Sequence, residues 1–205
     1  MAQEMSSDSP ARAEILDRLR TGRRGAIAPS YVHPAPAGDL AALFAAKAAA
    51  TDTRVTQLAS VEQVPEAIWA ALRETNAAAR LHLPQQSELD SLPWQRAPGL
   101  EVRRERPSGQ DAALSEADYG IAETGTLVFF SGAKTPSSWH FLPGLEFVLM
   151  PRERIVPRLE EVISRLGAIP ATVNLVTGPS RTADIEQTIE RGAHGPRELH
   201  ILLIG

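Results

Sequence analysis

One junction of the sequence gathers side chains that can bind an anion. An apolar run over residues 172–176 ends there in a Gly-Pro turn, and hydroxyl, guanidinium and carboxylate groups follow. The segment is Thr177-Gly178-Pro179-Ser180-Arg181-Thr182-Ala183-Asp184-Ile185-Glu186. We expect a strand, a tight turn and a helix start in succession. Ligands of α/β proteins usually bind at the carboxyl ends of strands, near helix amino termini whose free N–H groups attract anions. The junction therefore predicts a pocket for a small anionic or polar ligand.

The polar residues of this junction also have structural interpretations. Arg181 is suited to clamp a carboxylate or phosphate with two hydrogen bonds, or to pair with Asp184 or Glu186. Ser180 and Thr182 are suited to contact a ligand or to cap the expected helix. The helix dipole favours acidic residues at a helix start, which explains Asp184 and Glu186 without a ligand. The residues predicted to bind the ligand here are Gly178, Ser180, Arg181, Thr182 and Asp184.

A second motif, Ala122-Glu123-Thr124-Gly125-Thr126, stands before the apolar residues 127–130. Glu123 is interpreted either as a general base or nucleophile, or as a carboxylate that holds a turn through backbone N–H groups. Thr124, Gly125 and Thr126 are predicted to contact the ligand, because binding residues collect at the ends of elements.

A third motif, Gly192-Ala193-His194-Gly195-Pro196, precedes the last apolar run. His194 is predicted to contact the ligand as an acid, a base or a polar group, and the alternative is a hydrogen-bonded loop histidine. A metal site built from His140, Glu146 and His194 is conceivable, but no close histidine spacing supports it. We therefore predict no metal on this chain.

Alternating strands and helices must position these motifs. Helices are expected at Ala11–Arg20, from Asp39 to about Ala50, at Pro65–Glu74, at Pro157–Gly167 and at Ala183–Arg191, where Gly192 ends the last one. Strands are expected at Arg54–Ala59, Ala79–Leu83, near Leu100–Val102, and at Thr126–Phe130, Leu145–Met150, Thr172–Thr177 and Leu199–Ile204. Residues 84–113 are otherwise expected to be irregular. This order predicts an α/β fold with a mainly parallel sheet flanked by helices. An N-terminal helical arm, residues 1–38, would precede a domain at 39–205.

Composition excludes several classes of protein. The formal net charge is -4, and no residue of the chain is cysteine. A thiol nucleophile, disulfides and cysteine-bound zinc or iron–sulfur clusters are therefore excluded on this chain. The basic residues Arg103, Arg104 and Arg106 alternate with Glu101 and Glu105, which indicates a solvated surface loop and not a nucleic-acid site. No secretory segment and no membrane span are expected, and the lack of cysteine fits a cytoplasmic location.

In this order and spacing, the three motifs resemble the lactate-utilisation protein C family, whose members carry the LUD domain. Leu142-Pro143 and Ile155-Val156-Pro157 add to the resemblance, which covers the chain closely from about residue 115. It implies a fold like that of ribose-phosphate isomerase, glucosamine-phosphate deaminase and the CoA-transferases. One departure is that Glu146 lies near the place where family members often carry a histidine.

The resemblance implies a role in the oxidation of L-lactate to pyruvate. It implies that this chain is an accessory or ligand-binding subunit, without a cofactor of its own, of a system whose partner subunits carry iron–sulfur clusters. The lack of a Gly-x-Gly-x-x-Gly fingerprint agrees with a redox centre located elsewhere. The alternative is a stand-alone acyl-transfer, hydrolytic or isomerising enzyme that uses Glu123, by analogy with the glutamate of CoA-transferase-like folds. Assembly into a homo-oligomer is left open.

Overall fold

The computed structural model describes residues 10–22, 34–85, 87–132, 137–167, 170–183, 189–192 and 195–205. The chain divides into two compact units, residues 1–34 and 35–205. The first unit contains α1 (Pro10–Gly22), which confirms the first predicted helix. Ile15 and Leu19 on α1 are 59% and 62% exposed. The predicted division into an arm, 1–38, and a domain, 39–205, stays a prediction.

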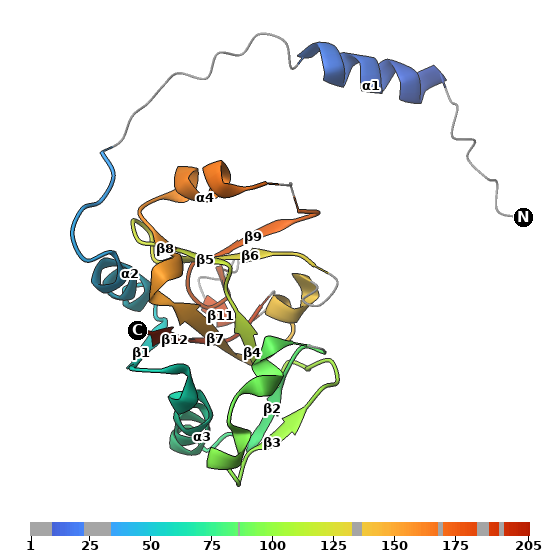
Figure 1. Ribbon diagram of the computed structural model, residues 1–205. Helices are drawn as coiled ribbons and strands as arrows, with labels where there is room; N and C mark the ends of the chain where they lie inside the picture. The colour runs from blue at the N-terminus through green and yellow to red at the C-terminus, as the bar shows by residue number, and fades with distance from the viewer. Residues whose placement is uncertain are drawn as a thin grey trace, which may run out of the picture. The chain divides into compact units, whose positions relative to one another are not determined.

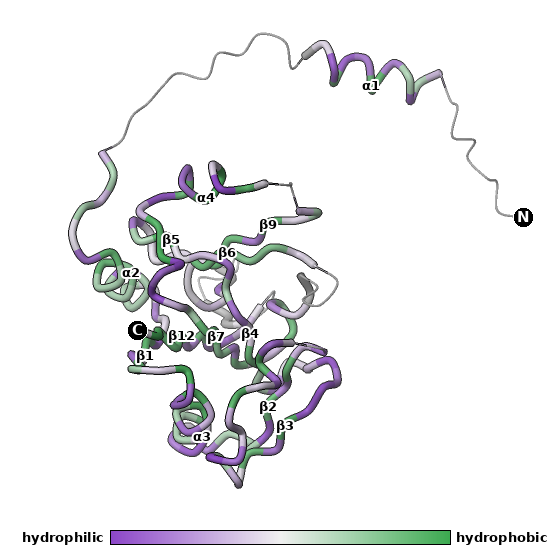
Figure 2. The backbone as a smooth tube through the Cα atoms, viewed as in Figure 1, coloured by the Kyte–Doolittle hydropathy of each residue, from purple (hydrophilic) through white to green (hydrophobic). Residues whose placement is uncertain are grey.

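A sheet of six parallel strands forms the centre of the second unit (Figure 1). Its strands, in spatial order, are β1 (Arg54–Leu58), β12 (Glu198–Ile204), β7 (Leu145–Pro151), β4 (Ala112–Glu116), β2 (Arg80–His82) and β3 (Glu101–Arg103). Every neighbouring pair is parallel, which confirms the predicted α/β class. The central strands β7 and β12 are apolar along most of their length (Figure 2). Continuous apolar runs are typical of parallel strands that are covered on both faces.

A second, smaller sheet lies above the first in Figure 1. Its strands, in spatial order, are β8 (Ile155–Val156), β5 (Tyr119–Ile121), β6 (Thr126–Phe130) and β9 (Val173–Val176). The β5–β6 and β6–β9 pairs are antiparallel, and the β5–β8 pair is parallel. The predicted strands at 126–130 and 172–177 therefore lie in this sheet, whereas β4, β5 and β8 were not anticipated.

Helices cover the main sheet on both faces. These helices are α2 (Leu40–Ala49) and α3 (Val64–Glu74), whereas α4 (Leu159–Arg165) packs on the second sheet. Short 3-10 turns lie at Val61–Gln63, Glu88–Ser91, Trp94–Arg96, Ser137–Phe141 and Arg152–Arg154. On one face, Ile68 and Leu72 of α3 pack with Phe147 of β7. On the other face, α2 and the second sheet meet the main sheet, and Phe44 and Val148 lie in that core. Asp39 caps α2 as predicted, accepting hydrogen bonds from the amides of residues 41 and 42.

The helix predicted at Ala183–Arg191 is wrong at both of its described ends. There β10 (Arg181–Ala183) pairs antiparallel with β11 (Ile189–Arg191), and residues 184–188 lie outside the described residues. Gly192, predicted to end a helix, has φ +89° and donates its N–H to the carbonyl oxygen of Ser180 at 3.0 Å. At these described positions, hydrogen bonds to a partner strand six to ten residues away outweigh the local preference for a helix.

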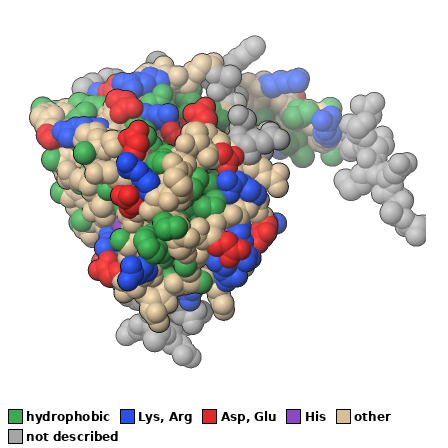
Figure 3. Space-filling model, turned by 60° about the horizontal axis from the view of Figure 1, so that its bottom comes forward, with side chains coloured by type: hydrophobic (Ala, Val, Ile, Leu, Met, Phe, Trp, Pro, Cys, Tyr) green, Lys and Arg blue, Asp and Glu red, His purple; other side chains and the backbone are tan. Residues whose placement is uncertain are grey.

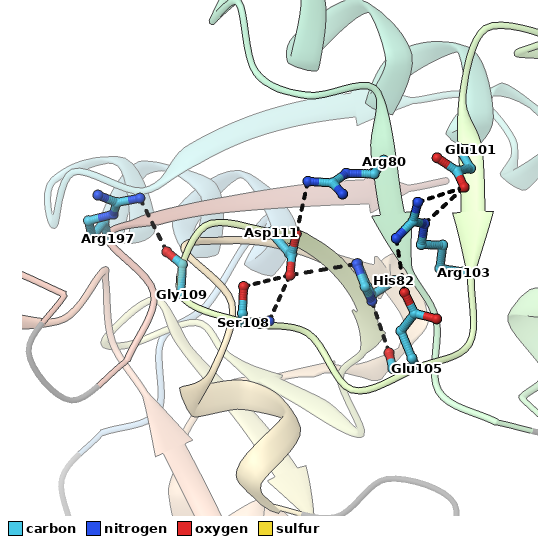
Figure 4. Close-up of polar contacts among 9 residues, drawn as sticks. All are labelled: Arg80, His82, Glu101, Arg103, Glu105, Ser108, Gly109, Asp111 and Arg197. Carbon is cyan, nitrogen blue, oxygen red and sulfur yellow. Dashed lines mark hydrogen bonds and ion pairs between the residues drawn. The ribbon is translucent and has the colours of Figure 1, made fainter.

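Two arginines of the basic cluster form ion pairs with nearby carboxylates, and Arg104 pairs with Asp90 at 2.5 Å. Arg103 pairs with Glu101 and Glu105 at 2.8 and 3.1 Å (Figure 4). Asp111, just before β4, accepts hydrogen bonds from the amide and hydroxyl of Ser108 at 2.9 and 2.7 Å. Acidic and basic side chains are also interspersed over the face in Figure 3. This arrangement agrees with the interpretation of the cluster as a solvated surface segment.

The main sheet contains a buried histidine, His200 of β12, whose protonation opposes folding. It is 4% exposed, its Nε2 lies 2.8 Å from the hydroxyl of Thr56, and its ring packs beside Phe147. Burial, helped by the charge of Arg54, lowers the pKa of His200 from 6.5 to about 4. Between these values the unfolded chain binds the proton and the folded chain does not.

We therefore expect the free energy of unfolding to fall as the pH decreases from 6.5 toward 4. Between pH 7 and pH 5 the contribution of His200 is about 2 kcal/mol. The measurement is chemical denaturation of wild type and His200→Gln at both pH values. The variant should lose less stability over this interval than wild type, and equal losses would contradict the assignment.

Candidate functional site

Two of the three motifs meet through a chain of hydroxyl groups. The Thr126 hydroxyl lies 2.7 Å from the hydroxyl of Thr124 and 2.7 Å from that of Thr177. The contact follows from the pairing of β6 with β9, in which Leu127 is opposite Val176. The start of β6 is thereby held beside the end of β9.

Two glycines of these motifs lie against the end of α2 with left-handed backbones. Gly125 has φ +69°, and a Cβ atom there would lie 2.3 Å from the amide nitrogen of Ala48. Gly178 has φ +81°, and a Cβ atom there would lie 2.7 Å from the carbonyl oxygen of Thr51. Any side chain would collide with backbone, so packing alone requires glycine at both positions.

The third motif packs against the Gly-Pro turn. Ser180 donates its N–H to the carbonyl oxygen of Pro196 at 2.8 Å. A Cβ atom on Gly195 would lie 3.2 Å from Cβ of Ser180, so the two segments are in close contact. The predicted ligand contacts Asp184 and His194, and also Glu186, lie outside the described residues.

A cavity of about 580 Å³ opens at this meeting point, within the usual size range of sites for small molecules. Its lining consists of Ala50, Thr51, His140, Phe141, Leu175, Val176, Thr177, Gly178, Pro179, Ser180, Arg181, Gly195 and Pro196. Gly178, Ser180 and Arg181 were predicted to bind the ligand. The predicted residue Thr126 reaches the lining indirectly, through its hydrogen bond to Thr177.

Arg181 forms an ion pair with Asp52, in the turn that follows α2. The two side chains are 41% and 50% exposed. Exposed pairs of this kind stabilise a protein by about 0–1 kcal/mol, so a carboxylate ligand can compete for the guanidinium. The alternative partners considered from the sequence, Asp184 and Glu186, lie outside the described residues.

Glu123 lies in the turn between β5 and β6, with an exposed side chain. Its amide donates a hydrogen bond to the carbonyl oxygen of Pro157 at 3.1 Å. It is absent from the lining of both cavities that include His140. Its catalytic role stays a prediction.

Three buried polar side chains form a cluster beside the cavity, of which His140 and Glu146 were considered together from the sequence only as conceivable metal ligands. Nδ1 of His140 lies 2.7 Å from Oε1 of Glu146, which also accepts a hydrogen bond from the Ser115 hydroxyl at 2.7 Å. His140 and Glu146 are 2% and 0% exposed. The His140 ring stacks on Phe129 with centroids 3.8 Å apart. The sequence signal was a carboxylate within the apolar run Leu145–Met150.

A second cavity, of about 260 Å³, also has His140 in its lining. Glu116, Asp118 and Arg154 line it as well, at the carboxyl end of β4. Burial raises the pKa of the Asp118 carboxyl, although the Phe130 amide, which donates to it at 2.7 Å, favours the charged form. The imidazole therefore lines both an acidic cavity and the cavity of the first and third motifs, which is called the motif cavity below.

Among the residues that the structure describes, no group of three or more histidine, aspartate and glutamate side chains could hold a metal ion. In the same part of the chain, no helix is both long enough and apolar enough to cross a membrane.

Comparison with known proteins matches residues 37–204 to the LUD domain. Lactate utilization protein C of Geobacillus kaustophilus is 33% identical over 101 residues, which cover 46% of this chain and 42% of that protein. The protein YkgG of Escherichia coli is 30% identical over 140 residues, 65% of this chain and 58% of its own length. An uncharacterised protein of Neisseria meningitidis is 40% identical over 98 residues, 46% of this chain and 42% of that protein. The chain thus spans about half the length of these relatives.

The crystal structure of a DUF162 family protein from Deinococcus radiodurans superimposes with a TM-score of 0.62. The alignment covers 83% of this chain and all of that chain, at 22% sequence identity. The likeness shows that the two proteins share a fold.

We predict that Gly125→Ala destabilises the protein by about 2–4 kcal/mol, because the new Cβ meets the α2 backbone and the left-handed conformation is strained. Gly132→Ala is the matched control, since a Cβ atom at Gly132 would have nothing within 4 Å. Its effect should stay within about 0.5 kcal/mol. Chemical denaturation measures both variants, and equal stabilities would show that the close approach to α2 is unimportant.

Proposed function

The chain belongs to the LUD-domain family, and we propose that it acts in lactate utilisation as a subunit that binds a small carboxylate. L-Lactate and pyruvate are the ligands that we propose. The observation that carries the proposal is the cavity between the first and third motifs, which has Arg181 and Ser180 in its lining. A cytoplasmic location is part of the proposal.

The cavity offers the two kinds of surface that such a ligand needs. The guanidinium of Arg181 can form two parallel hydrogen bonds with a carboxylate, and the Ser180 hydroxyl is a further polar group. Phe141, Leu175 and Val176 supply an apolar wall for a methyl group. The name of the relative from Geobacillus kaustophilus, lactate utilization protein C, supports the choice of ligand.

We propose that electrons leave the substrate through iron–sulfur partner subunits. The chain has no cysteine, so it supplies no thiolate for a cluster. This chain would then hold the carboxylate while a partner accepts electrons.

Arg181→Ala should weaken binding of L-lactate and pyruvate about tenfold to a hundredfold, because a charge-assisted hydrogen-bonded pair is lost. Calorimetric titration of the full chain measures both dissociation constants. Arg54→Ala is the matched control, since Arg54 forms a similarly exposed pair with Glu74 but lies outside the cavity lining. Undiminished binding by Arg181→Ala would show that the carboxylate is bound elsewhere.

Glu123→Gln separates the accessory subunit from the stand-alone enzyme. If Glu123 is a base, the variant loses turnover in a reconstituted lactate-oxidising complex while it keeps binding. Because Glu123 is outside both cavity linings that include His140, we expect turnover and binding close to wild type. Turnover of lactate by the wild-type chain alone, without any partner, would contradict the accessory role.

A further inference from the structure

We propose that His140, oriented by Glu146, binds the 2-hydroxyl group of a 2-hydroxy acid and makes the cavity selective for it over a simple carboxylic acid. The inference rests on the proposed function, since it needs the ligand's carboxylate in the same cavity. It assigns the part of the ligand that Arg181 does not bind.

The orientation of the imidazole follows from its buried partners. Oε1 of Glu146 already accepts the Ser115 hydroxyl, and it accepts the Nδ1–H of His140 as well. A neutral imidazole with its proton on Nδ1 presents a lone pair at Nε2. That lone pair is the acceptor which a ligand hydroxyl requires.

The fold holds this ring in place from several sides. Phe129 of β6 stacks on it, and Glu146 of β7 binds its Nδ1. Glu146 and Ser115 both lie on the face of the main sheet that the second sheet covers, because Val148, two residues after Glu146, packs in that core. A ring fixed in this way loses little freedom when it binds a ligand, which favours specific recognition.

A purely structural role explains less of the arrangement. Burial of a carboxylate is costly unless hydrogen bonds compensate it, and Oε2 of Glu146 has no hydrogen-bond partner among the described residues. An apolar side chain at this position of β7 would pack without that cost. Because His140 lines the motif cavity, ligand binding explains why His140 and Glu146 are present, whereas packing alone does not.

The charges around the ring come from several elements. Arg181 lies on the side of the motif cavity, whereas Glu88, Glu116, Asp118 and Arg154 line the cavity on the other side. Among the described lining residues on the motif side, Arg181 is the basic group that we assign to the carboxylate. The hydroxyl and the carboxylate of a 2-hydroxy acid would therefore meet two different groups of one cavity.

The test compares L-lactate with propionate, which has the same carbon chain and carboxylate but no hydroxyl. Calorimetric titration gives both dissociation constants for the full chain. Wild type should bind L-lactate about tenfold more tightly than propionate, the effect of one hydrogen bond to a buried group. Propionate binding also reports whether a variant is folded.

Two substitutions of His140 distinguish the roles of its two ring nitrogens. An asparagine amide can occupy the place of Nδ1 and keep the bond to Glu146, whereas a glutamine amide can reach the place of Nε2. His140→Asn should lose the preference for lactate and keep propionate binding, and His140→Gln should retain part of the preference. His200→Asn, a buried histidine outside both cavities, is the control and should keep the full preference.

Glu146 is tested as a positioning residue by the same ratio of dissociation constants. Glu146→Gln keeps an oxygen that accepts the Nδ1–H and should preserve the preference, whereas Glu146→Leu should abolish it. Loss of stability with an unchanged ratio in folded Glu146→Leu would show that Glu146 is only structural.

The outcomes distinguish the two proposals. If wild type binds L-lactate and propionate equally, or if His140→Asn keeps the preference, the inference about His140 is wrong while carboxylate binding stands. If wild type binds neither acid, both the proposed function and this inference are overturned.

Discussion

The site depends on the close contact between two loops and the end of α2. At Gly125 and Gly178 the backbone approaches α2 and the following turn so closely that a Cβ atom would overlap with main-chain atoms. Because β6 and β9 are neighbours, these two contacts hold two of the four strands of the second sheet against the same end of α2. The Gly-Pro turn, and with it Ser180 and Arg181, therefore takes its place from packing that involves no ligand. Such a preformed turn avoids the cost of ordering a loop when a ligand binds.

The main sheet supplies the second support of the site. Ser115 and Glu146 project from neighbouring parallel strands into the layer between the sheets, and there they hold His140. The main sheet thus supports the cavity through the His140 imidazole, which Glu146 binds, whereas the second sheet leads into it through the turn at 177–181. The cavity lies where the two layers meet, and each layer contributes a different chemical group to it. Recognition of a ligand with two polar ends is a natural use of such a junction.

The sequence predicted what depends on local pattern. Long apolar runs identified β6, β7 and β12, because buried strands need them, and the capping side chain of Asp39 marked the start of α2. The sequence pattern does not predict strand β4, because Ala112-Ala113-Leu114-Ser115-Glu116 has little strand propensity. The strand is defined by its pairing with β2 and β7. The hairpin at β10–β11 was mistaken for a helix for the same reason. The predicted residues of the Gly-Pro turn do line one cavity, but the contact between His140 and Glu146 is set by tertiary structure and could not be derived from spacing.

The central claim is that a small carboxylate binds between the turn at 177–181 and His140. A crystal structure of the chain with L-lactate tests it most directly. The account predicts the lactate carboxylate within hydrogen-bonding distance of Arg181 or Ser180, and the 2-hydroxyl within such a distance of Nε2 of His140. Lactate bound in the cavity of Glu116, Asp118 and Arg154, or beside Glu123 at the exposed turn, with the motif cavity holding only water, would contradict it.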